Sequence, residues 1–328
     1  MTEASTETPA RTNPLRQLAD LGQSIWYDNL SRDLVTSGAL ARMVEEDALS
    51  GVTSNPAIFQ KSLAAGGVYD RELREAVASG VGHAKAVFET LAIKDIQLAA
   101  DVLRPVYDGT SGADGFVSLE VSPYLAHDTE GTVEEARRLW RAVDRPNLMI
   151  KVPGTPAGVP AIETLIGDGI HVNVTLLFAV DAYEAVTWAY IGGLEARKQR
   201  GERVDDVASV ASFFVSRIDA WIDGRLEAAI EAGADAGAAR GLMGRAALAN
   251  AALAYGRCAE IHASDRWKAL AAAGAREQRL LWASTSTKNP DYPKTLYVDE
   301  LAAPNTVNTL PGATYDEVKA GPPQTAKL

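Results

Sequence analysis

The sequence is poor in cysteine and histidine. Cys258 is the single cysteine among 328 residues, so it has no partner for a disulfide bond, and we expect a free buried thiol in a reducing cytoplasm. The four histidines show no HExxH spacing and no zinc-type pairing with cysteine. We therefore expect no metal site, and ordinary hydrogen-bonded roles for His83, His127, His171 and His262.

Three further absences each exclude a class of protein. Neither GxGxxG nor GxxxxGK[ST] occurs, which disfavours a doubly wound open sheet that binds nucleotides. No apolar run approaches the length that spans a bilayer. The formal net charge of -11 argues against binding to nucleic acids or to anionic membranes, so an anionic substrate requires a local basic cluster.

The beginning of the chain differs in composition from the rest. Residues 1–13, MTEASTETPARTN, are polar and lack the apolar core of a signal peptide, which predicts a disordered N-terminal arm. Residues 14–328 contain no internal repeat and no domain-scale linker, and 47% of the whole chain is hydrophobic. This composition supports one large core, and we expect a single domain.

Short strand-like segments recur along the chain, each followed by a helical pattern or by a loop that leads into one. Eight such segments predict an α/β fold, namely a closed parallel (β/α)8 barrel of the TIM type with extra helices. The expected strands are 24–30, 49–55, 115–121, 147–153, 171–178, 207–215, 279–285 and 305–311.

Helix signals lie between these strands. Ser31 is a candidate N-cap for the segment that follows it, and Thr132 is a candidate N-cap for VEEARRLWRAV. Segments 73–103 and 226–270 are each long enough for two helices. We interpret these long segments as additions to the basic strand–helix repeat.

Polar side chains gather at the ends of the predicted strands, where barrels of this type carry their chemistry. Residues two apart, such as Asn173 and Thr175 or Ser118 and Glu120, face the same side of a strand. Inward-facing polar residues at these ends predict a pocket. The candidates are Asp28, Thr53, Asn55, Glu120, Lys151, Asn173, Thr175, Ser212, Arg217 and residues 284–288.

Lys151 is the most unusual of these residues, because it interrupts the apolar run NLMIKVP just before a proline. Burial lowers the pKa of a lysine, and the neutral amine is a nucleophile. With two carboxylates nearby, such a lysine suits imine chemistry on a ketone. A simpler interpretation stays open: the lysine stem lies along the strand end and its ammonium reaches water. The other candidates likewise have ordinary roles as helix caps, backbone partners or solvated residues.

Five motifs in this order resemble transaldolases, in particular their longer bacterial form: GVTSNPAIF, SLEVSPYLAHD, LMIKVPGTPAG, HVNVTLLF and SFFVSRIDAWID. The resemblance covers about residues 13–311. It implies a class I aldolase-type barrel, a Schiff base on Lys151 and no metal or organic cofactor. It also implies that Asp28 accepts the proton of the substrate C4 hydroxyl, and that Glu120 acts as acid and base through a water that Thr175 helps to hold.

The same resemblance assigns substrate contacts. It implies that Thr53 accompanies Asn55 in the motif of the second strand. Asn55 and Asn173 are expected to hydrogen-bond the dihydroxyacetone unit, and Ser212 is expected to contact its terminal hydroxyl. The resemblance also implies that the phosphate is bound by Arg217, and by Ser284 or Ser286 together with Lys288. Some transaldolases carry arginine at the last position, and lysine keeps the charge but loses the bidentate fork.

The C-terminus departs from the family pattern. After NTLP the chain continues only as GATYDEVKAGPPQTAKL, and its paired prolines predict a shortened tail with about one turn of helix. Such a tail is expected to lower stability or to leave the site more open, as in a truncated protein or a piece of a fusion. The resemblance leaves both a monomer and a homodimer open.

The predicted function is transfer of a dihydroxyacetone unit from sedoheptulose 7-phosphate to glyceraldehyde 3-phosphate in the pentose phosphate pathway. One alternative is a fructose-6-phosphate aldolase-like lyase, in which a glutamine and a tyrosine replace Glu120 and Phe214. Another is a non-catalytic barrel that binds sugar phosphates. The lysine and the two carboxylates argue against simple binding, because binding needs no amine nucleophile.

Overall fold

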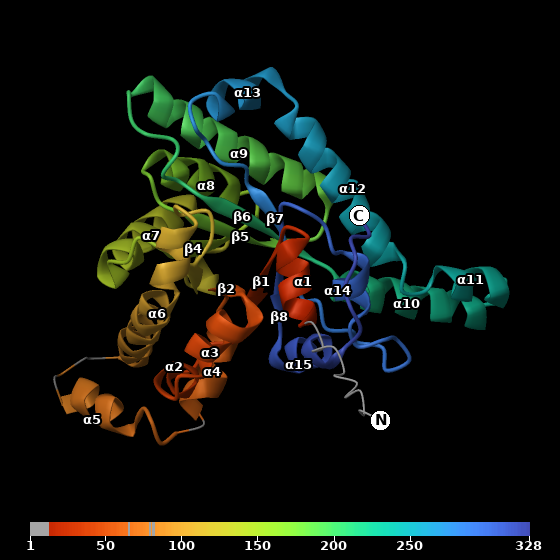
Figure 1. Ribbon diagram of the computed structural model, residues 1–328, viewed down its shortest axis with the longest axis horizontal. Helices are drawn as coiled ribbons and strands as arrows, with labels where there is room; N and C mark the ends of the chain where they lie inside the picture. The colour runs from red at the N-terminus through yellow and green to blue at the C-terminus, as the bar shows by residue number, and fades with distance from the viewer. Residues whose placement is uncertain (1–12, 65, 79, 81–82) are drawn as a thin grey trace, which may run out of the picture.

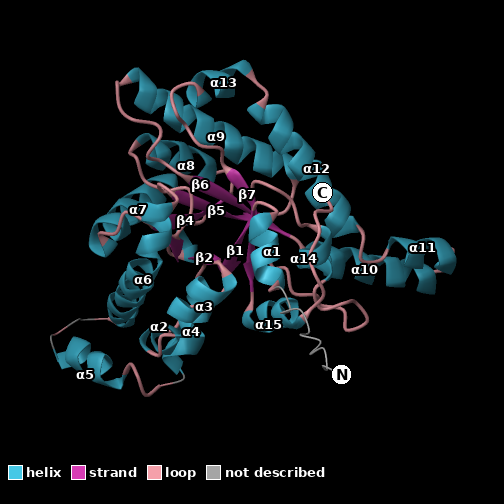
Figure 2. Ribbon diagram, in the orientation of Figure 1, coloured by secondary structure: helices cyan, strands magenta, loops and turns pink. Residues whose placement is uncertain are grey.

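The computed structural model describes residues 13–64, 66–78, 80 and 83–328, and at its centre lies a closed barrel of parallel strands. Consecutive strands pair with each other, and β1 closes the ring against β8. Figure 2 shows these strands at the centre, surrounded by helices. All eight predicted strands are confirmed: β1 (Gln23–Tyr27), β2 (Leu49–Val52), β3 (Phe116–Glu120), β4 (Leu148–Pro153), β5 (Val172–Leu177), β6 (Ser209–Phe214), β7 (Arg279–Ala283) and β8 (Thr306–Leu310).

Helices connect the strands and cover the outside of the barrel, with α5 and α11 lying furthest from its centre in Figure 1. The helices of the described residues are α1 (Pro14–Asp20), α2 (Arg32–Thr36), α3 (Ala39–Asp47), α4 (Pro56–Ala64), α5 (Asp70–Ala78), α6 (Ala84–Gly109), α7 (Thr129–Val143), α8 (Gly158–Gly167), α9 (Val180–Gln199), α10 (Ser216–Glu231), α11 (Ala236–Leu242), α12 (Ala246–His262), α13 (Asp265–Ala271), α14 (Leu296–Glu300) and α15 (Gly312–Ala320).

One of the two predicted N-caps is confirmed and the other is wrong. The Ser31 hydroxyl accepts a hydrogen bond from the backbone N–H of Leu34 at the start of α2. The segment then divides at Gly38, whose φ of 74° ends α2 and allows α3 to begin. Helix α7 starts one turn before Thr132, because the carboxylate of Asp128 caps it. An aspartate is at least as good an N-cap as a threonine, so the helix begins after Asp128 and not after Thr132.

The two long helical segments have different outcomes. The prediction of two helices for 73–103 is confirmed by α5 and α6. The prediction for 226–270 is wrong, because this stretch holds the end of α10 followed by α11, α12 and α13. Asp235 caps α11 and Ser264 caps α13, so two extra N-termini divide the apparent long helices.

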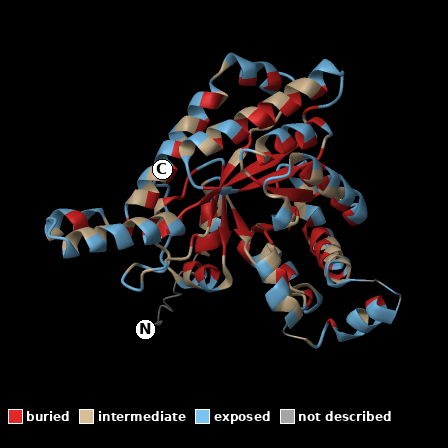
Figure 3. Ribbon diagram, turned by 180° about the vertical axis from the view of Figure 1, so that it is seen from behind, coloured by how far each residue is buried: buried red, intermediate tan, exposed pale blue. Residues whose placement is uncertain are grey.

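The barrel has two apolar layers. An inner cluster that includes Trp26, Phe116 and Met149 fills its interior, while a larger cluster lies between the strands and the helices. Gly51 is required beside the inner cluster, since a Cβ there would lie 2.4 Å from the Trp26 ring. Figure 3 shows the buried strands at the centre and the exposed outer faces of the helices. Each fully buried large side chain contributes about 1.5–3 kcal/mol.

Helices α1 and α15, the first and last helices of the described residues, pack near each other on the barrel. The arm predicted over 1–13 lies outside the described residues except Asn13, which is the N-cap of α1. The prediction of one helical turn in the tail is wrong, because α15 has nine residues. Tyr315 and Lys319 on α15 both donate to the buried Asp47 carboxylate, at 2.7 and 2.8 Å. Through these bonds the helix holds its place on the barrel before the paired prolines.

The residues after α15 continue along the barrel. The backbone N–H of Lys327 donates to the carbonyl of Ala302 at 2.9 Å. Within the described residues, no helix combines the length and the apolar character needed to cross a membrane.

Candidate active site

A cleft of about 610 Å³ opens at the carboxyl ends of the strands. Parallel strands bring these ends together although the residues are far apart in the sequence. All the residues that the resemblance assigns to the site line this cleft except Asn173. They are Asp28, Thr53, Asn55, Glu120, Lys151, Thr175, Ser212, Arg217, Ser284, Ser286 and Lys288.

Lys151 lies at the centre of the cleft, on β4. The β3–β4 register places it beside Glu120, and its Nζ lies 3.6 Å from Glu120 Oε2. The ammonium also donates to the carbonyl of Ser54 at 3.3 Å, and the residue is only 7% exposed. The lysine therefore does not extend into bulk water, and the solvated-residue interpretation is wrong.

Burial raises the pKa of Glu120 above the ordinary value of a glutamate, and the negative charge of Asp28 adds to this shift. The nearby ammonium of Lys151 opposes it, through both its charge and a hydrogen bond. A carboxyl whose pKa is raised toward neutrality is suited to both accepting and donating a proton.

Asp28 lies at the end of β1 in a short chain of hydroxyl groups. Thr53 Oγ1 donates to Asp28 Oδ1 at 2.7 Å and lies 2.7 Å from Thr309 Oγ1. Thr309, on β8, also lines the cleft and is 3% exposed. Thr309 is not among the residues predicted from the sequence, although its polar side chain near the end of the predicted strand 305–311 is a signal for it.

The three other polar candidates differ in their position. Asn55 Oδ1 accepts from the backbone N–H of Ile58 at 3.0 Å, so its Nδ2 is the group left to face the cleft. Ser212 lines the cleft and donates to Asn173 Oδ1 at 2.7 Å. Asn173 itself is fully buried and also donates to Ser118 at 3.0 Å, so it lies behind Ser212 and not on the cleft surface.

Basic side chains stand on the β6 and β7 side of the cleft. The Arg217 guanidinium lies over the Phe214 ring, 5.1 Å from its centroid, at the start of α10. Lys288 Nζ donates to Ser286 Oγ at 2.9 Å. Ser284 Oγ lies 3.0 Å from Ser216 Oγ, so Ser286 is the serine that accompanies a cation.

Two cleft residues have a backbone conformation that L-amino acids rarely adopt. Leu176 at the end of β5 has a φ of 61°, and Ser284 just after β7 has a φ of 57°. Such conformations cost about 1–3 kcal/mol and occur preferentially at functional sites. The sequence gives no signal for either, because neither position is a glycine.

The histidines and the cysteine lie away from the cleft. His171 bonds to the backbone of Pro146 and Ala208, which is the ordinary role expected of it. His262 has a local partner, because its Nδ1 lies 3.4 Å from Cys258 Sγ one turn earlier on α12, which is a hydrogen bond within one helix. Burial raises the pKa of this thiol to about 11, so it is an unreactive thiol. Among the described residues, no group of three or more potential metal ligands occurs.

Comparison with known proteins agrees with this geometry. The family model described as Transaldolase/Fructose-6-phosphate aldolase matches residues 25–327. The chain belongs to the transaldolase/fructose-6-phosphate aldolase family. The closed barrel with its buried lysine is therefore that of an enzyme family. Both activities in the family's name act on sugar phosphates.

Similar proteins named Transaldolase come from several bacteria. The one from Trichodesmium erythraeum (strain IMS101) is 51% identical over 311 residues, which cover 93% of this chain and 81% of that protein. The one from Thermobifida fusca (strain YX) is 53% identical over 306 residues, with 93% and 82% covered. The one from Saccharopolyspora erythraea is 54% identical over 300 residues, with 92% and 79% covered. Membership in this family confirms the resemblance on which the site residues were predicted.

Proposed function

We propose that this chain transfers a dihydroxyacetone unit between sugar phosphates. The donor is a ketose phosphate such as sedoheptulose 7-phosphate, and the acceptor is glyceraldehyde 3-phosphate. The products are erythrose 4-phosphate and fructose 6-phosphate, within the pentose phosphate pathway. The observation that carries the proposal is the buried Lys151 amine beside Glu120, in a cleft whose outer wall is basic. The single cysteine, which has no partner for a disulfide bond within the chain, supports a reducing cytoplasm as the protein's location.

The reaction begins when the Lys151 ammonium gives a proton to Glu120, 3.6 Å away, and the neutral amine then attacks the C2 carbonyl of the donor. The resulting carbinolamine loses water and becomes a protonated imine. Glu120, with its raised pKa, moves the protons for these steps through a water molecule that Thr175 helps to hold. The protonated imine then accepts the electron pair of the bond that breaks.

Cleavage of the C3–C4 bond requires removal of the C4 hydroxyl proton, and Asp28 takes it. The aldose phosphate leaves, and the three remaining carbons stay on Lys151 as an enamine. The acceptor aldehyde then enters, and the same steps run in reverse with Asp28 returning the proton. Thr53 holds the Asp28 carboxylate in place by its 2.7 Å hydrogen bond.

The dihydroxyacetone unit is oriented by the polar side chains around it. Asn55 offers its Nδ2, because its Oδ1 is engaged by the helix α4 backbone. Ser212 contacts the terminal hydroxyl, and Asn173 acts from behind by fixing the direction of the Ser212 hydroxyl. Arg217, Ser286 and Lys288 receive the phosphate.

Transfer is favoured over simple cleavage by the residues around the enamine. Phe214 lines the cleft and has no hydroxyl with which to protonate the enamine, and Glu120 is a carboxyl group. We therefore expect rapid turnover only when donor and acceptor are both present. The variant Phe214→Tyr is expected to shift activity toward release of free dihydroxyacetone.

The deciding experiment is reduction with borohydride in the presence of fructose 6-phosphate, followed by peptide mass spectrometry. The expected adduct lies on Lys151, and an adduct on Lys94 or Lys288 would refute the proposed site. A parallel assay measures dihydroxyacetone release with and without acceptor. Equal rates in the two conditions would favour the aldolase activity.

A further inference from the structure

Helix α4 contributes a basic residue to the cleft that the reaction steps above do not use. The helix starts directly after β2, at Pro56, and Ala57, Ile58 and Lys61 all line the cleft. Residues 57, 58 and 61 fall on one face of a helix with 3.6 residues per turn. Phe59 falls on the opposite face, where it is 2% exposed.

Two contacts fix the orientation of α4, one at its first turn and one on its buried face. The Asn55 side chain caps its first turn, and the Phe59 ring packs edge-on against Phe88, with centroids 5.9 Å apart. A helix held in this way cannot rotate without exposing Phe59. Lys61 is therefore directed at the cleft by the packing of its own helix.

Lys61 has no partner within the described part of the chain, where it makes neither a hydrogen bond nor an ion pair. Arg217 and Lys288 likewise have no carboxylate partner among the described residues. The two carboxylates of the cleft are engaged deeper, Glu120 with Lys151 and Asp28 with Thr53. Three unpaired cations therefore surround the outer part of the cleft, in a protein whose net charge is -11.

The three cations approach from opposite walls. In the closed ring β1 to β8, strand β2 is four places from β6, so α4 faces the β6 and β7 side across the mouth. Arg217 and Lys288 belong to that side, and Lys61 belongs to α4. An anion bound at Arg217 and Lys288 is thus open to a third cation from across the cleft.

We propose that Lys61 is a specificity-determining residue that contacts the phosphate of the bound sugar phosphate from the α4 wall. This inference rests on the proposed function and adds a residue of α4 to the side chains that bind the phosphate in it. Lys61 touches no reacting atom, so its contribution lies in binding and not in the chemical steps. Lysine is a suitable residue for this contact, because it acts as a point charge on a flexible stem.

The test compares Lys61→Gln, Lys61→Arg and the matched control Lys94→Gln, which removes an exposed lysine from α6 outside the cleft. For Lys61→Gln we expect KM for fructose 6-phosphate to rise about three- to tenfold, corresponding to about 0.7–1.4 kcal/mol, with kcat changed less than about twofold. Competitive inhibition by inorganic phosphate should weaken by a similar factor. Lys61→Arg should retain most of the wild-type KM, and Lys94→Gln should behave as wild type.

Unphosphorylated fructose provides the discriminating substrate. If its KM rises as much as that of fructose 6-phosphate in Lys61→Gln, Lys61 acts on the shape of the site and the inference is wrong. An equal effect of Lys94→Gln would point to general surface charge and would also overturn it. Failure of the proposed function is separate, because it is detected by the absence of a Lys151 adduct with dihydroxyacetone in the unmodified protein.

Discussion

The two ends of the barrel both hold a cavity and basic side chains, but they use their charges differently. The cleft at the carboxyl ends has a volume of about 610 Å³, and a cavity of about 480 Å³ lies at the amino ends of β3, β4, β6 and β7. At the carboxyl end, Lys61, Arg217 and Lys288 have no carboxylate partner among the described residues.

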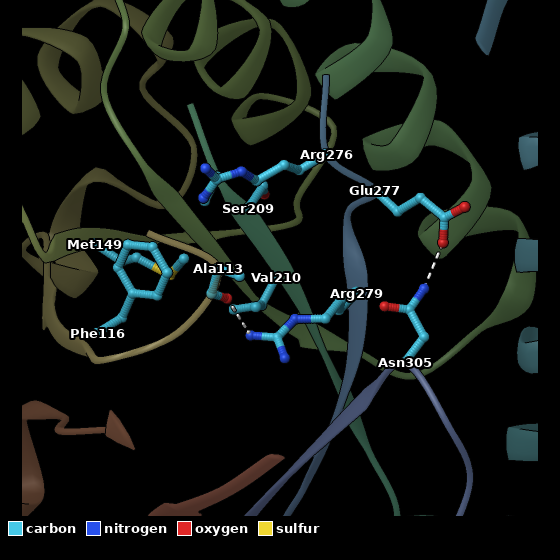
Figure 4. A pocket seen from close by; sticks show the side chains of 10 residues that line it. Ala113, Phe116, Met149, Ser209, Val210, Arg276, Glu277, Arg279 and Asn305 are labelled. Carbon is cyan, nitrogen blue, oxygen red and sulfur yellow. Dashed lines mark hydrogen bonds between the residues drawn. The ribbon is translucent and has the colours of Figure 1, made fainter. Parts of the chain in front are cut away.

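At the amino end, the basic residues are engaged by the protein itself. Arg279 donates to Ser24 at 2.6 Å and to the carbonyl of Ala113 at 3.0 Å, and lies 3.4 Å from the carboxylate of Asp114. Figure 4 shows Arg279 reaching Ala113, and Glu277 bonded to Asn305 on the other side of the cavity.

Arg276 completes this arrangement by donating to the carbonyl of Ser111. Together the two arginines hold the loop between α6 and β3 against the base of the barrel. A cavity with basic residues is thus a binding site only where the protein leaves the charges unpaired. Barrels of this type generally carry their chemistry at the carboxyl ends of the strands, and the unpaired cations at that end of this barrel fit the general pattern.

The largest expected effect is at Lys151. Lys151→Arg should reduce turnover by at least about three orders of magnitude, because arginine stays protonated and cannot form an imine. Circular dichroism and thermal melting should show a folded protein. Retention of substantial activity in this variant would remove Lys151 from the mechanism.

The comparison of the two ends predicts the opposite behaviour for Arg279. Arg279→Met leaves the Asp114 carboxylate, which is 9% exposed at its side chain, without its cation. The free energy of unfolding should fall by about 3 kcal/mol, while kcat/KM changes less than about twofold. Denaturant titration and steady-state kinetics measure the two quantities. A loss of activity without a loss of stability would show that the amino end takes part in function.

Arg217→Ala should raise KM for phosphorylated substrates about tenfold or more, since loss of a charged hydrogen bond costs roughly 1.5–3 kcal/mol. Kinetics with fructose 6-phosphate and with unphosphorylated fructose provide the measurement. If both substrates are affected equally, the assignment of Arg217 to phosphate is wrong.

The smallest expected effect concerns the pKa of Glu120. Lys151→Met removes the ammonium that opposes the raised pKa, so the pKa should rise further, whereas Asp28→Asn should lower it. Titration of ¹³C-labelled glutamate carboxyls by NMR reports both shifts. A folded-state pKa above the ordinary value also means that stability falls as pH rises from that value through the folded pKa, and this fall should be larger in Lys151→Met. A fall of the Glu120 pKa in Lys151→Met, or a rise in Asp28→Asn, would contradict the proposed interaction of the three charges.

Much of this fold was predictable because its signals are local. Eight strands follow from short apolar segments, and the polar residues at their ends follow from the period of two in a strand. The helix errors arose where several caps compete, as at Asp128 against Thr132, or where Asp235 and Ser264 start extra helices. Such choices depend on neighbouring contacts that the pattern does not contain.

The candidate site was predictable from the sequence except for Thr309 and the wall formed by α4. Lys151 and Glu120 stand on strands within motifs that carried the resemblance, and Asp28 directly follows β1. Lys61 stands on a helix, and its direction follows from the packing of Phe59, which the sequence does not reveal. Asn173 shares a face with Thr175, but its depth in the barrel places it behind Ser212.

The hydroxyl chain beside Asp28 has a direction. Each threonine hydroxyl has one hydrogen, so while Asp28 is ionised, Thr53 donates to Asp28 and must accept from Thr309. A hydrogen that Asp28 takes from a substrate has no onward path through these two oxygens unless both hydroxyls turn over. It therefore leaves through the cleft, toward the same side from which it arrived. In the proposed mechanism, Asp28 therefore returns its proton to the sugar, or to water beside it, and not to the threonine hydroxyls.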